Sequence, residues 1–93
     1  MDLSFKIDDL LLGKKLDEAE VKALAYLKAH PNQKFSEWQI AQELYPFSNE
    51  SIEAMSESFT GMWATYRALQ RLAEGGSISE ERGYPHSFYK YAG

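Results

Sequence analysis

The chain has no cysteine among its 93 residues, and it has only two histidines. Without cysteine there can be no disulfide bond, no zinc site built from thiolates and no thiol catalysis. The histidines, His30 and His86, lie far apart in the sequence, and no group of residues has the spacing of metal ligands. We therefore expect neither a metal nor another cofactor.

Long hydrophobic runs are also absent. The longest aliphatic run is Leu10-Leu11-Leu12, far shorter than a membrane-spanning helix needs. The first ten residues, MDLSFKIDDL, contain acidic residues early and do not have the apolar stretch of a signal peptide. We expect a cytoplasmic protein.

The arrangements that enzymes use for catalysis are missing as well. His86 stands beside Ser87, but neighbouring residues of a strand point to opposite faces, so the pair does not form part of a catalytic triad. The glycine pair Gly75-Gly76 fits neither a dinucleotide-binding fingerprint nor a phosphate-binding loop. The acidic pairs of the chain are expected to be solvated. The sequence therefore predicts a protein that is not an enzyme.

Acidic and basic residues are unevenly distributed along the chain. The net charge is −4, which disfavours nucleic acid because the phosphate backbone attracts basic surfaces. Residues 1–57 contain six Lys and Arg against eleven Asp and Glu, whereas residues 58–93 contain four against three. Only the last third is not acidic, so any nucleic-acid contact is expected there. At this length the chain forms one domain with one core.

Residues 1–16 allow two interpretations. Leu3, Phe5 and Ile7 alternate as in a strand, whereas Ile7, Leu10 and Leu11 would share one face of a helix. We expect an arm or a short helix, separate from the domain of residues 17–93. Such a segment packs either on a partner subunit or back on its own core.

Helices are predicted at about 17–30, 36–45 and 50–74. The first has capping-box spacing at Asp17 and Glu20, and the second has it at Ser36 and Gln39. A short extended piece, residues 33–35, separates these two helices. The third is either one long helix, capped by Ser48 or Asn49, or a short helix and a main helix joined by a turn near residues 56–58.

The C-terminal part has the pattern of a hairpin. Gly75-Gly76 ends the third helix, and two strand-like runs follow within residues 77–91, joined through residues 82–85. The fold class expected is mainly α with a small β-hairpin, α+β. Alternation along the last strand sends Tyr89 and Tyr91 to one face and Phe88 to the other. Trp38 and Trp63 are expected in the core.

The end of the third helix carries a more specific pattern, Leu69-x-x-Leu72-x-x-x-Gly76-x-Ile78. It resembles the end of the third helix and the start of the wing in winged helix-turn-helix regulators of the MarR and PadR groups. The resemblance covers about residues 17–91. It implies a winged helix-turn-helix fold, with residues 77–91 as the wing, and DNA binding through the third helix and the wing.

The chain departs from that pattern between the second and third helices. Roughly a dozen residues separate Leu44 from Ser58, where the family has a short turn. Either a helical turn is inserted, or the third helix is extended at its N-terminus by about two turns. The extension would bring Glu53 and Glu57 near the place where DNA should lie.

Winding at about 100° per residue divides the third helix into two faces. The face expected to pack inward consists of Phe59, Met62, Tyr66, Leu69 and Ala73. The opposite face consists of Thr60, Ala64, Arg67 and Arg71, with Gly61 and Ala68 beside it. Small residues and arginines suit a major groove. The same strip is also compatible with a solvated face, or with close packing of helices through glycine and alanine.

The function expected first is that of a transcriptional regulator that binds duplex DNA as a homodimer. Its candidate DNA contacts are Lys34, Ser58, Thr60, Ala64, Arg67, Arg71, Arg82, His86 and Lys90. The alternative is a winged-helix module that binds another protein and not DNA. A continuous positive face would favour DNA, whereas a face interrupted by Glu53, Glu57, Glu80 and Glu81 would favour the interaction module.

Overall fold

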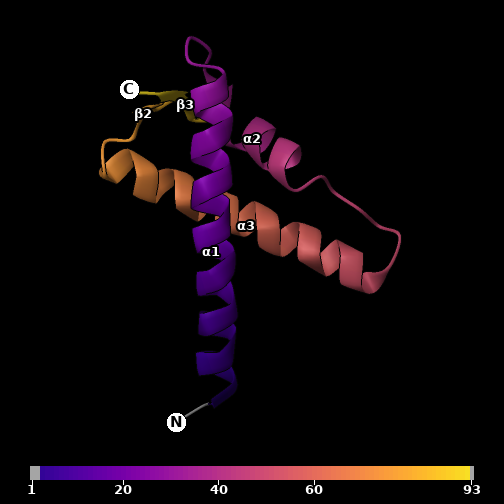
Figure 1. Cartoon of the computed structure of the whole chain (residues 1–93). Coiled ribbons are helices and arrows are strands. Elements are labelled where there is room, and N and C mark those ends of the chain that lie inside the picture. Colours follow the sequence, from indigo (N-terminus) through magenta and orange to yellow (C-terminus); the bar gives the residue numbers. More distant parts are fainter. Residues whose placement is uncertain (1–2, 93) are drawn as a thin grey trace.

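The computed structural model describes the backbone of residues 3–92 and the side chains of residues 13–92. Its elements follow one another as α1 (Leu3–Ala29), β1 (Phe35–Ser36), α2 (Glu37–Leu44), α3 (Ile52–Glu74), β2 (Ile78–Glu81) and β3 (Phe88–Tyr91). The chain is thus mainly helical with a small antiparallel sheet, as the sequence predicted. Figure 1 shows α1 crossing α3, with α2 on one side and the sheet near the C-terminal end of α1.

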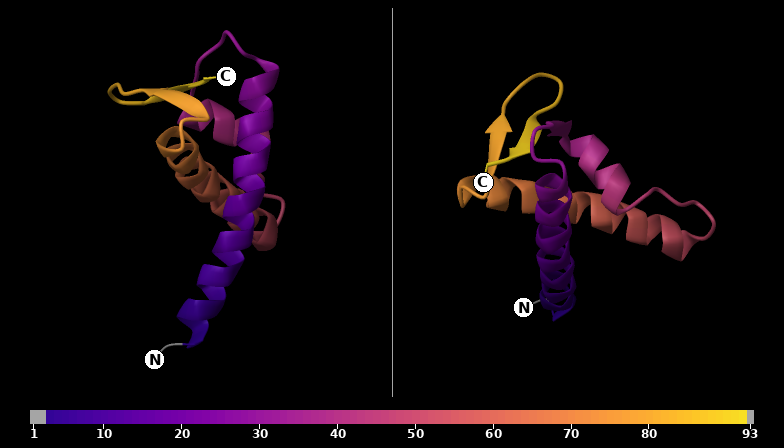
Figure 2. Two further views of the ribbon diagram at one scale, coloured as in Figure 1. Left: turned by 60° about the vertical axis from the view of Figure 1, so that its left-hand side comes forward. Right: turned by 45° about the horizontal axis from the view of Figure 1, so that its top comes forward.

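Helix α1 is longer than predicted. It runs unbroken from Leu3 to Ala29, through Gly13 and past Asp17, so the helix start expected at Asp17 is wrong. One glycine inside a helix costs only about 1 kcal/mol, and no proline interrupts this segment. The N-terminal part of α1 extends beyond α3, away from α2 and the sheet (Figures 1 and 2).

Helix α2 begins with the predicted capping box. The backbone N–H of Gln39 donates to the Ser36 hydroxyl at 3.2 Å, and the backbone N–H of Ser36 donates to the Gln39 side-chain oxygen at 2.8 Å. Two donors that the helix itself cannot satisfy are therefore bonded.

Loss of this cap should be measurable. We expect Ser36→Ala to lower the free energy of unfolding by about 1 kcal/mol, the usual cost of removing a serine N-cap. Urea titration followed by circular dichroism measures it. Ser56→Ala, on an exposed position inside α3, is the matched control and should change stability by less than about 0.5 kcal/mol. Equal effects of the two substitutions would contradict the assignment.

Helix α3 is one continuous helix, so the turn considered near residues 56–58 does not form. Its N-cap is Ser51 rather than Ser48 or Asn49, and the Ser51 hydroxyl accepts the N–H of Ala54 at 3.0 Å. The helix ends at Gly75 as predicted, and Gly76 follows with a φ of 82°, which glycine adopts without strain. The long spacing after Leu44 is therefore explained by the extended third helix.

The sheet has the strand order β1-β3-β2, and β3 is antiparallel to both neighbours. Phe35 of β1 pairs with Tyr89, and Ile78 of β2 pairs with Tyr91. The short extended piece predicted near residue 35 is thus strand β1. Its pairing with β3 holds the start of α2 beside the hairpin.

The main core lies between α1, α2, the C-terminal half of α3 and the sheet. Its fully buried members are Ala23, Leu27, Ile40, Leu69, Ile78 and Tyr89. A smaller cluster of Ala19, Ala64 and Ala68 lies where α1 and α3 cross, with Leu16 and Tyr45 packed against it. Alanines at this crossing let the two helices approach closely. Tyr89 and Tyr91, which alternation predicted on one face of the strand, both pack on the core.

Burial of Tyr89 makes stability depend on pH in the alkaline range. Burial, with a further contribution from Glu80, raises the pKa of the Tyr89 hydroxyl to about 12 from an ordinary value of 10. The unfolded chain therefore releases this proton at lower pH than the folded chain. Stability is fully present below pH 10 and should decrease as the pH rises from about 10 to 12. Tyr89→Phe should make the decrease shallower in urea titrations across that range, and an unchanged slope would contradict the assignment.

Candidate interaction surface

The orientation of α3 about its own axis differs from the one that we expected. Gly61, Ala64, Thr65 and Ala68 are buried, and Ala64 and Ala68 pack against Ala19 of α1. The expectation that Ala64 faces outward is therefore wrong. The alternative that we kept open, close helix packing through glycine and alanine, is what the structure shows. Of the face expected to pack inward, Leu69 is buried, whereas Phe59 is 50% exposed.

Tyr45, the residue after α2, explains why this face of α3 must be small. A Cβ atom built on Gly61 would lie within 3.0 Å of three carbon atoms of the Tyr45 side chain. The glycine thus provides the space in which the Tyr45 ring lies against α3. Phe59 and Trp63 of the same helix are, by contrast, at least half exposed to solvent.

Large apolar side chains gather on the outer side of α2 and α3. Trp38 is 53% exposed and Trp63 is 60% exposed, so the expectation that both tryptophans belong to the core is wrong. Phe47 and Phe59 are each 50% exposed, and their ring centroids lie 5.7 Å apart. Ile52, at the start of α3, is 83% exposed.

Some of these side chains line a groove between α2 and the N-terminal half of α3. The groove has a volume of about 410 Å³ and is lined by Trp38, Gln42, Tyr45, Phe47, Ser58, Phe59 and Met62. We call it the aromatic groove. A second hollow, lined by Ile52, Met55, Ser56, Phe59 and Thr60, continues from Phe59 toward the start of α3.

The sequence contained a signal for this surface that we interpreted as core. Apolar residues recur along α3 at Ile52, Met55, Phe59, Met62, Tyr66 and Leu69. At 1.5 Å per residue this strip is about 25 Å long, longer than a core of so small a domain can cover. Its C-terminal part enters the core, and its N-terminal part is left exposed. Trp38 and Phe47 join it only through the fold.

Two of the candidate DNA contacts are buried. Ala64 is 1% exposed, and Ser58 is 9% exposed. The Ser58 hydroxyl donates to the backbone oxygen of Ala54 at 2.8 Å, and the same hydroxyl accepts the backbone N–H of Ser48 at 3.0 Å. Ser58 therefore binds the loop that precedes α3. Thr60 donates to the backbone oxygen of Ser56 at 2.9 Å.

The basic candidates do not form a continuous positive face. The Nε of Arg71 lies 2.8 Å from a carboxylate oxygen of Glu20 on α1. Lys34 lies 2.8 Å from Glu81, and the Nε of Arg82 lies 3.5 Å from Glu80. These three pairs involve the six residues Arg71, Glu20, Lys34, Glu81, Arg82 and Glu80. Arg67, His86 and Lys90 are exposed.

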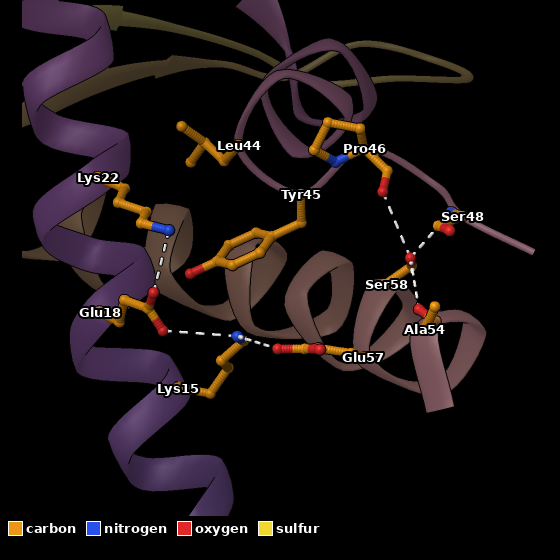
Figure 3. A pocket seen from close by; sticks show the side chains of 10 residues that line it. All are labelled: Lys15, Glu18, Lys22, Leu44, Tyr45, Pro46, Ser48, Ala54, Glu57 and Ser58. Atoms are coloured by element: carbon orange, nitrogen blue, oxygen red, sulfur yellow. Dashed lines mark hydrogen bonds and ion pairs between the residues drawn. The ribbon is translucent and has the colours of Figure 1, made fainter. Parts of the chain in front are cut away.

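A pocket of about 330 Å³ lies on the other side of Tyr45, between α1 and α3 (Figure 3). Lys15 and Lys22 of α1 each place the ammonium nitrogen 4.7 Å from the centre of the Tyr45 ring. Lys22 also lies 3.0 Å from Glu18, and Lys15 lies 3.8 Å from Glu57 of α3. Both ammonium groups are thus close to carboxylates, and the pocket is best explained as a structural contact.

The pKa shifts in this pocket agree with that description. The hydrogen bond from Lys22 lowers the pKa of Glu18, and the same bond raises the pKa of Lys22. Burial, and next the negative charge of Glu18, raise the pKa of Tyr45. All three groups therefore keep their usual charge states near neutral pH, and none is prepared for proton transfer.

No protein family, curated protein or solved structure matches this chain. In the part of the chain that the structure describes, no helix is long and apolar enough to cross a membrane. The same residues contain no cluster of three or more His, Asp or Glu side chains that could hold a metal ion. We take the aromatic groove as the candidate functional site because half-exposed aromatic side chains gather around it.

Proposed function

We propose that this chain is a winged-helix module that binds a protein through the aromatic groove. The observation that carries the proposal is the group of half-exposed aromatic side chains, Trp38, Phe47 and Phe59, around one hollow. Aromatic residues are enriched in protein interfaces, and the fully buried centre of such interfaces contains few charges. A contiguous apolar patch of this kind marks an interaction site.

The order of the elements supports a winged-helix fold. A short strand separates the first helix from the second, the third helix follows directly, and a hairpin comes after it. The strand order β1-β3-β2 places the first strand beside the last. In this fold α3 would be the recognition helix. The proposal assigns its outer face to a protein partner because that face carries Phe59 and Trp63 at its centre.

Electrostatics support a protein partner over DNA. Glu80 and Glu81 lie next to Arg82 and Lys34, so the positive charges of this region are balanced locally. DNA affinity depends on releasing counterions from phosphates, and basic residues that already have acidic neighbours contribute less to it. Glu80 and Glu81 are two of the four glutamates that we named as the mark of the interaction module.

A capture experiment tests the proposal. The wild-type chain and the Trp38→Ser/Phe59→Ser variant are immobilised, and proteins retained from a lysate of the source cells are identified by mass spectrometry. We expect at least one protein to be retained by the wild-type chain and not by the Trp38→Ser/Phe59→Ser variant. Tyr84→Ser is the matched control, because Tyr84 is fully exposed at the tip of the hairpin, and it should retain the partner. A partner retained equally by all three proteins would contradict the proposal.

DNA binding is the second candidate, and the exposure of Arg67 on the outer side of α3 favours it. A fluorescence anisotropy titration with mixed genomic duplex DNA, with wild type beside Arg67→Ala/Arg71→Ala, decides between the two. The interaction module predicts no binding at tens of micromolar protein. Binding that salt weakens, and that the double variant loses, would favour DNA instead.

A further inference from the structure

We propose that the aromatic groove of one copy binds the N-terminal part of α1 from a second copy, and that the exchange is reciprocal. The inference rests on the proposed function, since it names the partner of the same groove. We call residues 3–12 the arm. The inference joins two features of the structure, an apolar groove and a projecting apolar helix.

The arm is a helix that extends away from the body of its own molecule (Figure 1). Six of its ten residues are apolar, namely Leu3, Phe5, Ile7, Leu10, Leu11 and Leu12. Leu3, Ile7 and Leu10 have the spacing i, i+4, i+7 that puts residues on one face of a helix. Most helical stability in proteins comes from packing of an apolar face, so a helical segment of this composition favours a surface to pack on.

The arm cannot reach the groove of its own molecule. It continues α1 without a break, and α1 crosses α3 at Ala19, whereas the groove lies between α3 and α2. In Figures 1 and 2 the arm points away from α2. An arm that enters the groove must therefore come from another copy.

The groove suits an amphipathic helix as its ligand. Proteins that bind such helices use a hydrophobic groove, and the helix supplies anchors at i, i+3, i+4 and i+7. The hollow beside Ile52 and Met55 lengthens the groove, so that more than one turn of a helix has apolar side chains to contact. Trp38 and Phe59 would be the anchors on the groove side.

Reciprocal exchange gives an interface of adequate size. A half-exposed aromatic side chain offers on the order of 100 Å², so Trp38, Phe47 and Phe59 together offer about 300 Å² in each copy. An arm that contributes a similar area brings each contact to about 600 Å², and two contacts bury about 1,200 Å², the lower end of the range for stable interfaces. A two-fold axis makes the contacts identical and closes the assembly at two copies.

Sedimentation equilibrium and light scattering test the inference. We expect wild type to be a dimer, and we expect both the arm variant Ile7→Asp/Leu10→Asp and the groove variant Trp38→Asp/Phe59→Asp to be monomers. The dissociation constant should rise at least about thirtyfold, the effect of losing one strong interface contact. Tyr84→Asp is the control and should remain a dimer. Circular dichroism confirms that each variant is folded.

Mixing the two monomeric variants distinguishes this arrangement from others. The arm variant keeps its groove, and the groove variant keeps its arm, so the mixture should form heterodimers through one intact contact. Pairing between two arms would leave the groove variant dimeric before mixing, and pairing between two grooves would leave the arm variant dimeric. A wild-type monomer, or a mixture that stays monomeric, would overturn the inference.

The absence of cysteine permits a direct test of the contact. Leu10→Cys and Phe59→Cys chains, mixed under oxidising conditions, should give a mixed disulfide in preference to either homodimeric one. Predominance of the homodimeric disulfides would overturn the inference. The proposed function can be tested separately from this inference. If the wild type is monomeric but the Trp38→Ser/Phe59→Ser variant still loses a captured partner, the groove binds another protein, and only the inference of exchange between two copies fails.

Discussion

Replacing Leu69 by alanine should lower the free energy of unfolding by about 2–5 kcal/mol, because the leucine is fully buried between α1, α2 and the sheet. In a domain of this size that corresponds to a fall in Tm of about 4–8 °C per kcal/mol. Phe59→Ala removes a larger side chain from the same apolar strip of α3. It should cost less than about 1 kcal/mol, because half of that side chain is already exposed.

Urea titration followed by circular dichroism measures both effects. The comparison is best made in the Ile7→Asp/Leu10→Asp background, which removes the proposed association between copies, so that the Phe59 effect reports folding alone. If Phe59→Ala cost as much as Leu69→Ala, the orientation of α3 described above would be wrong. That result would instead support the orientation expected from the sequence, in which Phe59 and Leu69 both pack inward.

The second large effect is expected at Gly61. Gly61→Ala should destabilise the fold by about 1–3 kcal/mol, because the added Cβ would lie too close to the first atoms of the Tyr45 side chain, which cannot move without shifting the end of α2. An alanine inside a helix normally adds about 1 kcal/mol of stability relative to glycine. A loss at this position would therefore show that the clash outweighs the propensity.

Gly13→Ala is the matched control, since Gly13 is also inside a helix but has nothing within 4 Å of the added carbon. It should stabilise the chain by about 0.5–1 kcal/mol. Urea titration of the two variants side by side gives opposite signs if the contact between Gly61 and Tyr45 is as described. A gain of stability in both would show that Tyr45 does not pack against Gly61.

Local signals in the sequence were sufficient for most of the elements. The capping box at Ser36 and Gln39 fixed the start of α2, the glycine pair fixed the end of α3, and alternation put Tyr89 and Tyr91 on one face of β3. Each of these depends on residues close together in the chain. The start of α1 was missed because good capping spacing at Asp17 also occurs inside a helix, where nothing uses it.

The sequence by itself determined the class of fold, the single domain and the absence of cysteine chemistry, because composition and local hydrogen bonding decide these. Only the tertiary structure decided which side of α3 is exposed. Periodicity shows that Ile52, Phe59 and Leu69 share a strip of α3, but it does not show how much of that strip the rest of the protein covers. Packing of Ala64 and Ala68 against α1, and of Gly61 against Tyr45, set the orientation of α3, and the limited extent of the core left the N-terminal half of the strip exposed to solvent.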